Sequence, residues 1–162
     1  MLYLSLGSNL GDRAKNIESA YRLIEKKIGL IVQKSSIWES EPWGYASFHY
    51  FYNTVCMVDS HISDMHQLLK EIRKIEATLG RTRSKSNQYE DRTIDIDILS
   101  INNTIVANNN LCIPHPKMHL RKFVLLPLNE ISPEWKHPNL NKSVSELLEE
   151  CSDLTKVTKL II

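Results

Sequence analysis

The stretch "DRTIDIDIL", residues 91–99, alternates isoleucine with aspartate. Such alternation predicts a β-strand whose isoleucines face a buried layer. Aspartate is uncommon in strands, yet Asp95 and Asp97 share one face, roughly 6.6–6.8 Å apart along the strand. Two neighbouring carboxylates repel each other, so the pair indicates either a solvated strand face or a site that binds a cation.

The elements on either side of this strand predict a small α+β fold. Further strands are predicted over residues 2–6, 30–38 and 51–58. Helical spacing of apolar residues predicts one helix that begins after Asp12 and ends at Gly29, and a second between Asp64 and Gly80. The resulting order β-α-β-β-α-β is that of a ferredoxin-like antiparallel sheet with its helices on one face.

The C-terminal part of the chain adds helices to this core. The apolar run before Pro127 predicts a helix that stops at this proline. Ser143 and Glu146 form the pattern of a capping box at the start of a final short helix. The sequence contains no repeat, no low-complexity segment and no linker, so we expect residues 1–162 to form a single domain.

The composition is that of an ordinary globular protein, with 42% hydrophobic and 24% charged residues. A formal net charge of +1 argues against non-specific binding of nucleic acid. Cys56, Cys112 and Cys151 follow no metal-binding pattern and are expected to be reduced thiols. The N-terminus turns polar too early for a signal peptide, and no apolar run approaches the roughly 20 residues of a membrane span. We therefore expect a cytoplasmic protein that binds neither nucleic acid nor a membrane.

The aspartate pair suits a hard divalent cation. Mg²⁺ commonly takes one or two carboxylates together with phosphate oxygens of a substrate. A zinc site at His115 and His119 is disfavoured, because no Cys/His set with zinc-like spacing completes the four ligands of a structural zinc. The pair is therefore interpreted as a magnesium site.

Basic residues flank the aspartates on both sides in the sequence. They are Arg81, Arg83, Lys85 and Arg92 before the pair, and His115, Lys117, His119, Arg121 and Lys122 after it. Arginine binds phosphate oxygens in a bidentate manner, so the set indicates a nucleoside triphosphate; the alternative is a solubilising loop. The sequence has neither a P-loop nor a kinase glycine-rich loop, which excludes those two classes of phosphotransferase. Residues 81–92 are long enough to form a lid.

Aromatic residues concentrate in "EPWGYASFHYFYN", residues 41–53. In the predicted strand, Phe51 and Asn53 share one face. A ring beside an amide suits a flat heterocycle, which stacks on the ring while the amide bonds its edge; a packed core explains these residues equally well. Phe123 is a second candidate for stacking.

Six motifs cover nearly the whole chain in order: "LSLGSNLGD", "EPWG", "FYN", "IEATLGRTR", "DRTIDIDIL" and "IPHPKMHLRKFVLLPL". Together they resemble the 6-hydroxymethyl-7,8-dihydropterin pyrophosphokinases of folate biosynthesis. The resemblance implies an enzyme that transfers pyrophosphate from ATP to the hydroxymethyl group of the pterin and releases AMP. It implies two Mg²⁺ ions, ATP as co-substrate and one pterin pyrophosphokinase domain over residues 1–162, which we expect to act as a monomer.

The resemblance also implies roles for individual residues. The two Mg²⁺ ions would be held by Asp95 and Asp97, and the catalytic set would be Arg81, Arg92, Asp95 and Asp97. The pterin ring would lie between Phe51 and Phe123, with further contacts from Gly7, Ser40, Pro42, Trp43 and Asn53. ATP would contact Glu76, Arg83, Tyr89, Arg92, His115 and Arg121.

The loop "SKSNQYEDR", residues 84–92, departs from some relatives. Those have Trp in place of Tyr89 and Gly-Pro in place of Glu90 and Asp91. Two other functions would use similar features. A nucleotidyltransferase would share the carboxylates but release pyrophosphate, and a ferredoxin-like RNA-binding module would need aromatic residues on an open sheet face.

Overall fold

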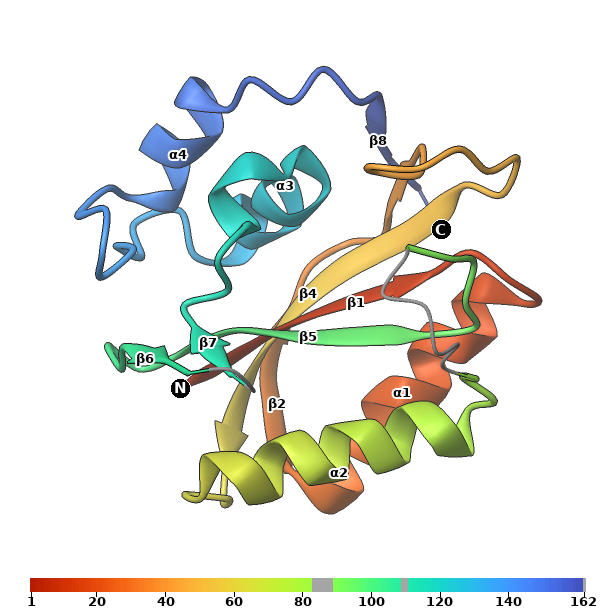
Figure 1. Ribbon diagram of the computed structural model, residues 1–162, viewed down its shortest axis with the longest axis horizontal. Helices are drawn as coiled ribbons and strands as arrows, with labels where there is room; N and C mark the ends of the chain where they lie inside the picture. The colour runs from red at the N-terminus through yellow and green to blue at the C-terminus, as the bar shows by residue number, and fades with distance from the viewer. Residues whose placement is uncertain (83–88, 109–110, 162) are drawn as a thin grey trace.

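The computed structural model describes residues 1–82, 89–108 and 111–161, and its centre is one antiparallel sheet (Figure 1). The central strand β1 (Leu2–Ser8) pairs with β5 (Asp95–Ile101) on one side and with β4 (Phe51–Ser60) on the other. Strand β4 also pairs with β2 (Gly29–Lys34) and β3 (Trp38–Ser40), and β8 (Val157–Lys159) extends the sheet beyond β3. This strand order confirms the predicted ferredoxin-like core.

Helices cover both faces of the sheet (Figure 1). On one face lie α1 (Arg13–Lys27) and α2 (Met65–Thr78), and on the other lie α3 (Lys122–Ile131) and α4 (Val144–Glu150). Asp12 and Asp64 cap α1 and α2 as predicted, each accepting a hydrogen bond from a backbone N–H of the first turn. The predicted capping box at Ser143 is also present.

Strand β1 divides the interior into two cores, because successive side chains of a strand point to opposite faces. Leu2, Leu4 and Leu6 pack with α1 and α2, whereas Tyr3 packs with α3 and α4. The isoleucines at positions 94, 96 and 98 belong to the first core. The alternating aspartates of β5 therefore lie on the face that carries α3.

The predicted strand over residues 30–38 is two strands instead. Lys34 of β2 lies opposite Cys56, and Trp38 of β3 lies opposite Asn53, so three residues of one chain segment face two of β4. An extra residue in one strand interrupts regular pairing. Gly29 follows α1 as predicted. Glycine is required at this position because the backbones of β2 and β4 approach closely, and a Cβ on residue 29 would lie 2.1 Å from the carbonyl oxygen of Asp59.

The predicted end of a helix at Pro127 is wrong, because α3 continues to Ile131. Its apolar side chains Leu125, Leu128 and Ile131 are buried against the sheet, and this burial outweighs the hydrogen bond that proline cannot donate. Sequence analysis also missed β8, the small sheet of β6 (Val106–Ala107) and β7 (Cys112–Ile113), and the 3₁₀ turn η1 (Met118–Leu120).

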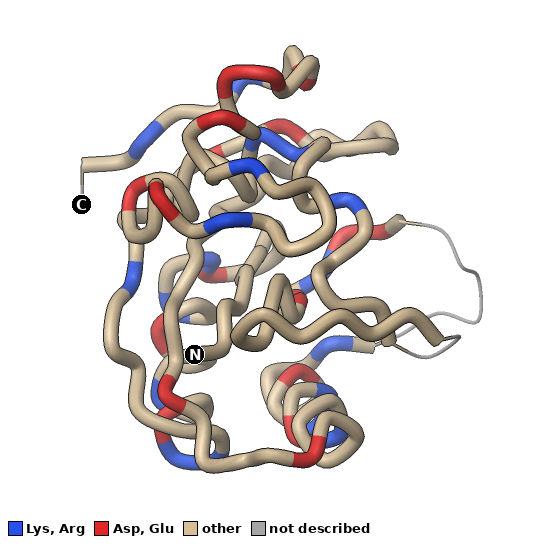
Figure 2. The backbone as a smooth tube through the Cα atoms, turned by 90° about the vertical axis from the view of Figure 1, so that its left-hand side faces the viewer, with Lys and Arg blue, Asp and Glu red and all other residues tan. Residues whose placement is uncertain are grey.

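Positions with positive and negative side chains are interspersed along the described chain (Figure 2). None of the helices described has both the length and the apolar character required to cross a lipid bilayer.

Candidate active site

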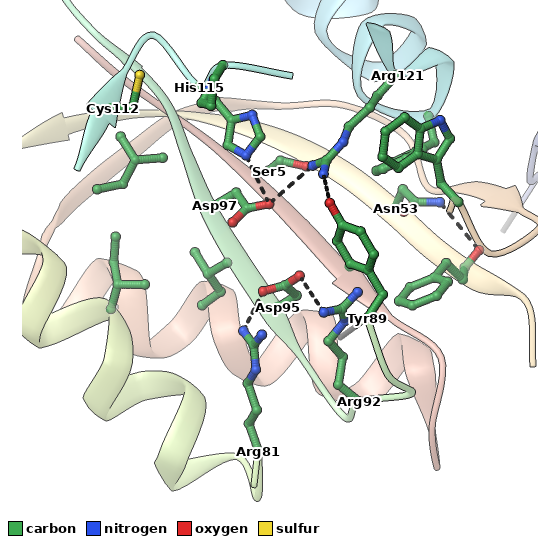
Figure 3. A pocket seen from close by; sticks show the side chains of 18 of the residues that line it. Ser5, Asn53, Arg81, Tyr89, Arg92, Asp95, Asp97, Cys112, His115 and Arg121 are labelled. Atoms are coloured by element: carbon green, nitrogen blue, oxygen red, sulfur yellow. Dashed lines mark hydrogen bonds and ion pairs between the residues drawn. The ribbon is translucent and has the colours of Figure 1, made fainter. Parts of the chain in front are cut away.

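Asp95 and Asp97 form the floor of a pocket on the face of the sheet that carries α3. In the pairing of β1 with β5, Gly7 lies opposite Asp95 and Ser5 lies opposite Asp97. These small neighbours leave the space above the two carboxylates open, and Figure 3 shows both carboxylates directed into that space. Farther along the same face, Tyr3 and the helices close the second core.

The pocket has a volume of about 500 Å³, which is within the usual range for small-molecule sites. The residues expected from the sequence that line it are Gly7, Ser40, Trp43, Phe51, Asn53, Arg81, Tyr89, Arg92, Asp95, Asp97, His115, Arg121 and Phe123. The structure thus brings together residues that are more than 100 positions apart in the sequence.

Two arginines hold the carboxylate of Asp95. Nη1 of Arg81 contacts Asp95, and Nη1 of Arg92 lies 3.3 Å from Oδ2 of Asp95 (Figure 3). The same Arg81 atom also contacts Glu76. Glu76 is buried, and its carboxylate also accepts a 2.9 Å hydrogen bond from the backbone N–H of Ile96. Helix α2 therefore fixes Arg81 against the start of β5 through Glu76.

Asp97 is less compensated by positive charge than Asp95. Within the described parts of the chain, the nearest cationic atom is Nη1 of Arg121, 3.8 Å from Oδ2 of Asp97, and the imidazole Nε2 of His115 is 3.9 Å away. Burial within the pocket and the negative charge of Asp95 together raise the pKa of Asp97. The side chain still keeps 41% of its exposure, so the carboxylate is open to a ligand from the pocket.

His115 is a neutral hydrogen-bond donor at the rim. Burial and the neighbouring Arg121 lower the pKa of His115 to about 4. Its Nδ1 accepts a 3.1 Å hydrogen bond from the backbone N–H of Lys117, so the ring proton resides on Nε2. That N–H points toward Asp97 and can serve an anionic ligand above it.

The other half of the pocket has the features of a site for a flat ring. Asn53 is 2% exposed, and its Nδ2 donates 2.9 Å to Oγ of Ser40 and 3.3 Å to the carbonyl of Trp38. Phe51 is buried beside it, and the guanidinium of Arg121 lies over the ring of Phe123 at 5.7 Å. A Cβ on Gly7 would be 3.6 Å from both Asn53 and Phe51, so glycine keeps this wall of the pocket low.

Tyr89 reaches across the pocket mouth to the aromatic loop. Its ring is stacked on Tyr45 with centroids 6.3 Å apart and meets Trp43 edge-on at 6.2 Å. Its hydroxyl accepts a hydrogen bond from Nη2 of Arg121 at 3.1 Å (Figure 3). The same hydroxyl accepts a second hydrogen bond, from Nζ of Lys117 at 3.2 Å. Tyr89 thus links the segment before β5 to the residues that follow β7.

Two of the expected site residues that the structure describes do not line the pocket. Glu76 was expected to contact ATP, but it lies behind Arg81 and bonds the backbone of β5, so its contribution in this structure is to position that arginine. Pro42 is flanked by lining residues without lining the pocket itself. Arg83 lies outside the described residues.

The side of the pocket between α2 and β7 was not predicted from the sequence, and Cys112 was left out of the expected site. This side comprises Leu69, Ile72 and Arg73 of α2, Ile96 and Ile98 of β5, and Asn108, Leu111, Cys112 and Pro116 beyond it. In the described residues, β5 pairs with β1 alone in the main sheet, so the pocket extends around the free edge of β5 and reaches both faces of this strand. Alternation predicted the isoleucines as core, and no local signal shows that an edge strand can serve both purposes.

Two buried guanidinium atoms of the pocket have no hydrogen-bond partner among the residues that the structure describes. They are Nε of Arg92 and Nε of Arg121. An unpaired buried donor is unfavourable, and both belong to side chains that line the pocket. The arrangement is therefore suited to an anionic ligand that completes their hydrogen bonding.

A family model described as 7,8-dihydro-6-hydroxymethylpterin-pyrophosphokinase (HPPK) matches residues 3–133. The chain belongs to this family. Membership confirms the resemblance found in the sequence and the expected class of ATP-dependent pyrophosphokinase. The HPPK relatives with curated names include the 2-amino-4-hydroxy-6-hydroxymethyldihydropteridine pyrophosphokinase of Porphyromonas gingivalis, which is 40% identical over 141 residues, covering 85% of this chain and 94% of that protein.

Longer HPPK relatives carry additional sequence. The folic acid synthesis protein FOL1 of Dictyostelium discoideum is 40% identical over 147 residues, which are 91% of this chain but only 22% of FOL1. A solved Plasmodium falciparum HPPK-DHPS structure superposes with a TM-score of 0.77 at 20% identity, covering 92% of this chain and 44% of that one. This structural likeness confirms the fold.

Proposed function

We propose that this chain transfers pyrophosphate from ATP to the hydroxymethyl group of 6-hydroxymethyl-7,8-dihydropterin and releases AMP, a step of folate biosynthesis. The observation that carries the proposal is the position of Asp95 and Asp97 in one pocket between a ring site and a group of arginines. Membership in the HPPK family supports the same reaction.

The ring site would hold the pterin. Phe51 and Phe123 would stack on its two faces, and Asn53 would bond its edge, because Ser40 and Trp38 already fix the orientation of the amide. Gly7, Pro42 and Trp43 complete the set expected there. Their task is to orient the hydroxymethyl group toward the aspartates, which lowers the entropic part of the barrier.

The opposite half would hold ATP. Leu69, Ile72 and Leu111 offer an apolar surface for the adenine, and the thiol of Cys112 lies at its edge. Arg92, His115 and Arg121 would bind the phosphates, with Arg81, Arg83 and Tyr89 in supporting contacts. The unpaired Nε atoms of Arg92 and Arg121 support phosphate binding at this position.

Asp95 and Asp97 would hold Mg²⁺, for which we propose two ions. The oxygen donors of these residues fit Mg²⁺, because two carboxylates share one strand face. The raised pKa of Asp97 indicates that the negative charge of the pair is poorly compensated without a cation. Among the described residues, no His, Cys, Asp or Glu completes a three-residue cluster, so substrate oxygens and water would fill the remaining positions, as Mg²⁺ commonly accepts. When bound, Mg²⁺ neutralises phosphate charge and activates the attacking oxygen.

The side chains of the protein then act by position and charge. The arginines stabilise the negative charge that shifts to the leaving AMP, and the neutral His115 donates from Nε2. Tyr89, seated on Tyr45 and Trp43, reduces the access of water, which competes with the pterin as the nucleophile. The protein forms no covalent intermediate in this scheme.

The test is incubation with MgATP and 6-hydroxymethyl-7,8-dihydropterin, followed by separation of nucleotides and pterins by chromatography and mass spectrometry. We expect AMP and a pterin diphosphate in equal amounts. A 6-methyl pterin, which lacks the hydroxyl, should give no AMP. Release of pyrophosphate with a nucleotide-linked pterin, or the absence of any product, would contradict the proposal.

We further propose that residues 1–162 act as a monomeric domain in the cytoplasm, without binding nucleic acid. The free thiols of Cys56, Cys112 and Cys151 support a reducing compartment. The long relatives offer the alternative of a fusion to other folate enzymes. Light scattering on the purified chain, with and without substrates, measures the mass and would contradict the proposal if it gave a dimer.

A further inference from the structure

Asp91 accepts an unusually complete set of hydrogen bonds. Its Oδ1 accepts from Nδ2 of Asn9 at 2.7 Å and from the hydroxyl of Tyr45 at 3.0 Å. Its Oδ2 accepts from Oγ of Ser47 at 2.9 Å and from Nδ1 of His49 at 2.8 Å. An ionised carboxylate has about four acceptor positions, and all four donors come from two segments that are distant in the sequence.

The second of these segments reaches the ring side of the pocket through Tyr45, and Asn9 contacts it through Nδ2. Asn9 directly follows β1, and its backbone N–H donates 3.1 Å to the carbonyl of Arg92. Its Oδ1 accepts 2.7 Å from the N–H of Arg92. Residues 45–49 belong to the loop between β3 and β4, which also carries Trp43. Asp91 therefore sits where both segments meet.

Tyr89 and Arg92, which lie close to Asp91 in the sequence, are proposed to contact ATP and also contact residues of the ring side. Arg92 contacts Asp95, and its guanidinium lies 5.4 Å from the centre of the Phe51 ring. Tyr89, two residues before Asp91, bonds Arg121 and stacks on Tyr45. Any displacement of Asp91 would move Tyr89 and Arg92 together relative to the loop.

We propose that Asp91 is a positioning residue that fastens the loop of residues 45–49 on the pterin side to the segment of residues 89–92 on the nucleotide side, so that the two substrate sites are assembled as one unit. This inference rests on the proposed function, because it assigns the two sides to the pterin and to ATP. Asp91 itself does not line the pocket and would touch neither substrate.

The chemistry of these contacts favours hydrogen bonds to Asp91 that persist over the physiological pH range. Partial burial alone would raise the pKa of Asp91, but the hydrogen bonds from His49, Ser47, Asn9 and Tyr45 lower it to about 2. The carboxylate therefore stays ionised in the physiological range, and hydrogen bonds to an ionised acceptor are about twice as strong as neutral ones. Asparagine at this position could not accept from all four donors, because its NH₂ group only donates.

The test compares Asp91→Ala and Asp91→Asn with the unchanged protein in steady-state kinetics. We expect KM to rise at least tenfold for both the pterin and MgATP in Asp91→Ala, with a smaller rise in Asp91→Asn. Ser47→Ala, which changes a residue outside the pocket, should raise both values in the same direction. The double variant Asp91→Ala/Ser47→Ala should have KM values no higher than those of Asp91→Ala alone, because both changes remove the same contact.

Glu146→Ala is the matched control. The Glu146 carboxylate accepts a 2.7 Å hydrogen bond from the backbone N–H of Ser143 at the start of α4, and neither residue lines the pocket or adjoins a lining residue in the sequence. We expect it to lower the Tm while leaving both KM values within twofold. If Asp91→Ala also lowered only the Tm, or if its effects were additive with Ser47→Ala, the proposal would be overturned.

Amide hydrogen exchange gives a readout that needs no turnover. In the substrate-free protein, Asp91→Ala should increase exchange in residues 44–49, and Ser47→Ala should increase exchange in residues 89–92. Unchanged exchange in both segments would overturn the fastening itself. If exchange increased in both segments but the unchanged protein made no AMP, the result would refute the proposed function and leave the contact between the two segments established.

Discussion

At the scale of the residue, the role of the two aspartates depends on the residues of β1 that lie opposite them. Alternation in "DRTIDIDIL" was sufficient to predict that Asp95 and Asp97 share a face. The pairing partners Gly7 and Ser5 are what leaves that face open as the floor of a pocket. A larger residue at either position of β1 would fill the space that a polyphosphate and its cations need.

Asp97→Asn should separate stability from activity. In the metal-free protein, burial and Asp95 raise the pKa of Asp97, so the fold loses stability as pH rises and this group ionises. The variant keeps the shape and removes the charge. We expect its Tm in EDTA to equal or exceed that of the unchanged protein at pH 8. The difference should shrink toward about pH 4, where the carboxyl of Asp97 is protonated in the folded protein and about half protonated in the unfolded chain.

The same variant should lose Mg²⁺-dependent AMP formation by about 10²–10³-fold or more, since it removes a charged group from the reacting centre. Asp59→Asn, on an exposed position of β4, is the control and should change neither property. A Tm profile for Asp97→Asn that lies below the unchanged protein at every pH would contradict the account of repulsion between the aspartates.

Asp91 shows why part of the site could not be predicted at this scale. Residue types, spacing and the family resemblance predicted the groups that we propose to contact substrates, because phosphate and Mg²⁺ each prefer recognisable side chains. The donors to Asp91 are Asn9, Tyr45, Ser47 and His49, which are common polar residues without a spacing rule. Only their convergence in space gives them a shared purpose.

At the scale of the element, hydrophobic periodicity predicted most helices and strands, and the errors have physical causes. Asp12, Asp64 and Ser143 marked helix starts correctly, because capping is a local interaction. Pro127 misled because its effect is also local, whereas the burial of α3 on the sheet is tertiary. Strand β8 was missed since a three-residue edge strand depends on its partner β3 more than on its own sequence.

Gly29→Ala tests the close approach at the start of β2. The added Cβ would lie 2.1 Å from the carbonyl oxygen of Asp59 and 2.7 Å from Cα of Ser60, both of them backbone atoms. Relief requires β2 and β4 to separate, so we expect a loss of about 1–3 kcal/mol in the free energy of unfolding. Urea denaturation measures this loss, and a value below about 0.5 kcal/mol would contradict the clash.

Leu30→Ala provides the comparison for Gly29→Ala in the same strand. Leu30 is 65% exposed, so its truncation should change the free energy of unfolding by no more than about 0.5 kcal/mol. The pair of variants separates steric exclusion between two backbones from a general sensitivity of β2 to substitution.

At the scale of the whole molecule, the sheet serves as a partition with different roles on its two faces. One face is closed along its length by α1 and α2, while the other is closed by α3 and α4 over only part of its length. The remaining part is the pocket, and its floor combines residues of β1, β4 and β5. The fold class followed from the order of the elements, but which half of the second face stays open depends on where α3 docks, and no local pattern contains that information.

Because both halves of the pocket rest on this shared floor, ligand binding should stabilise the entire domain. A ligand that binds only the folded state adds about 2.7 kcal/mol when present at 100 times its Kd. We expect Mg²⁺ with a non-hydrolysable ATP analogue to raise the Tm by several degrees, and the analogue in EDTA to raise it much less. Asp95→Asn should remove most of the difference between the two conditions, while Leu30→Ala should preserve it. An equal shift with and without Mg²⁺ would contradict the assignment of the cation to the two aspartates, because the free energy of binding would then come from the arginines and the apolar side of the pocket alone.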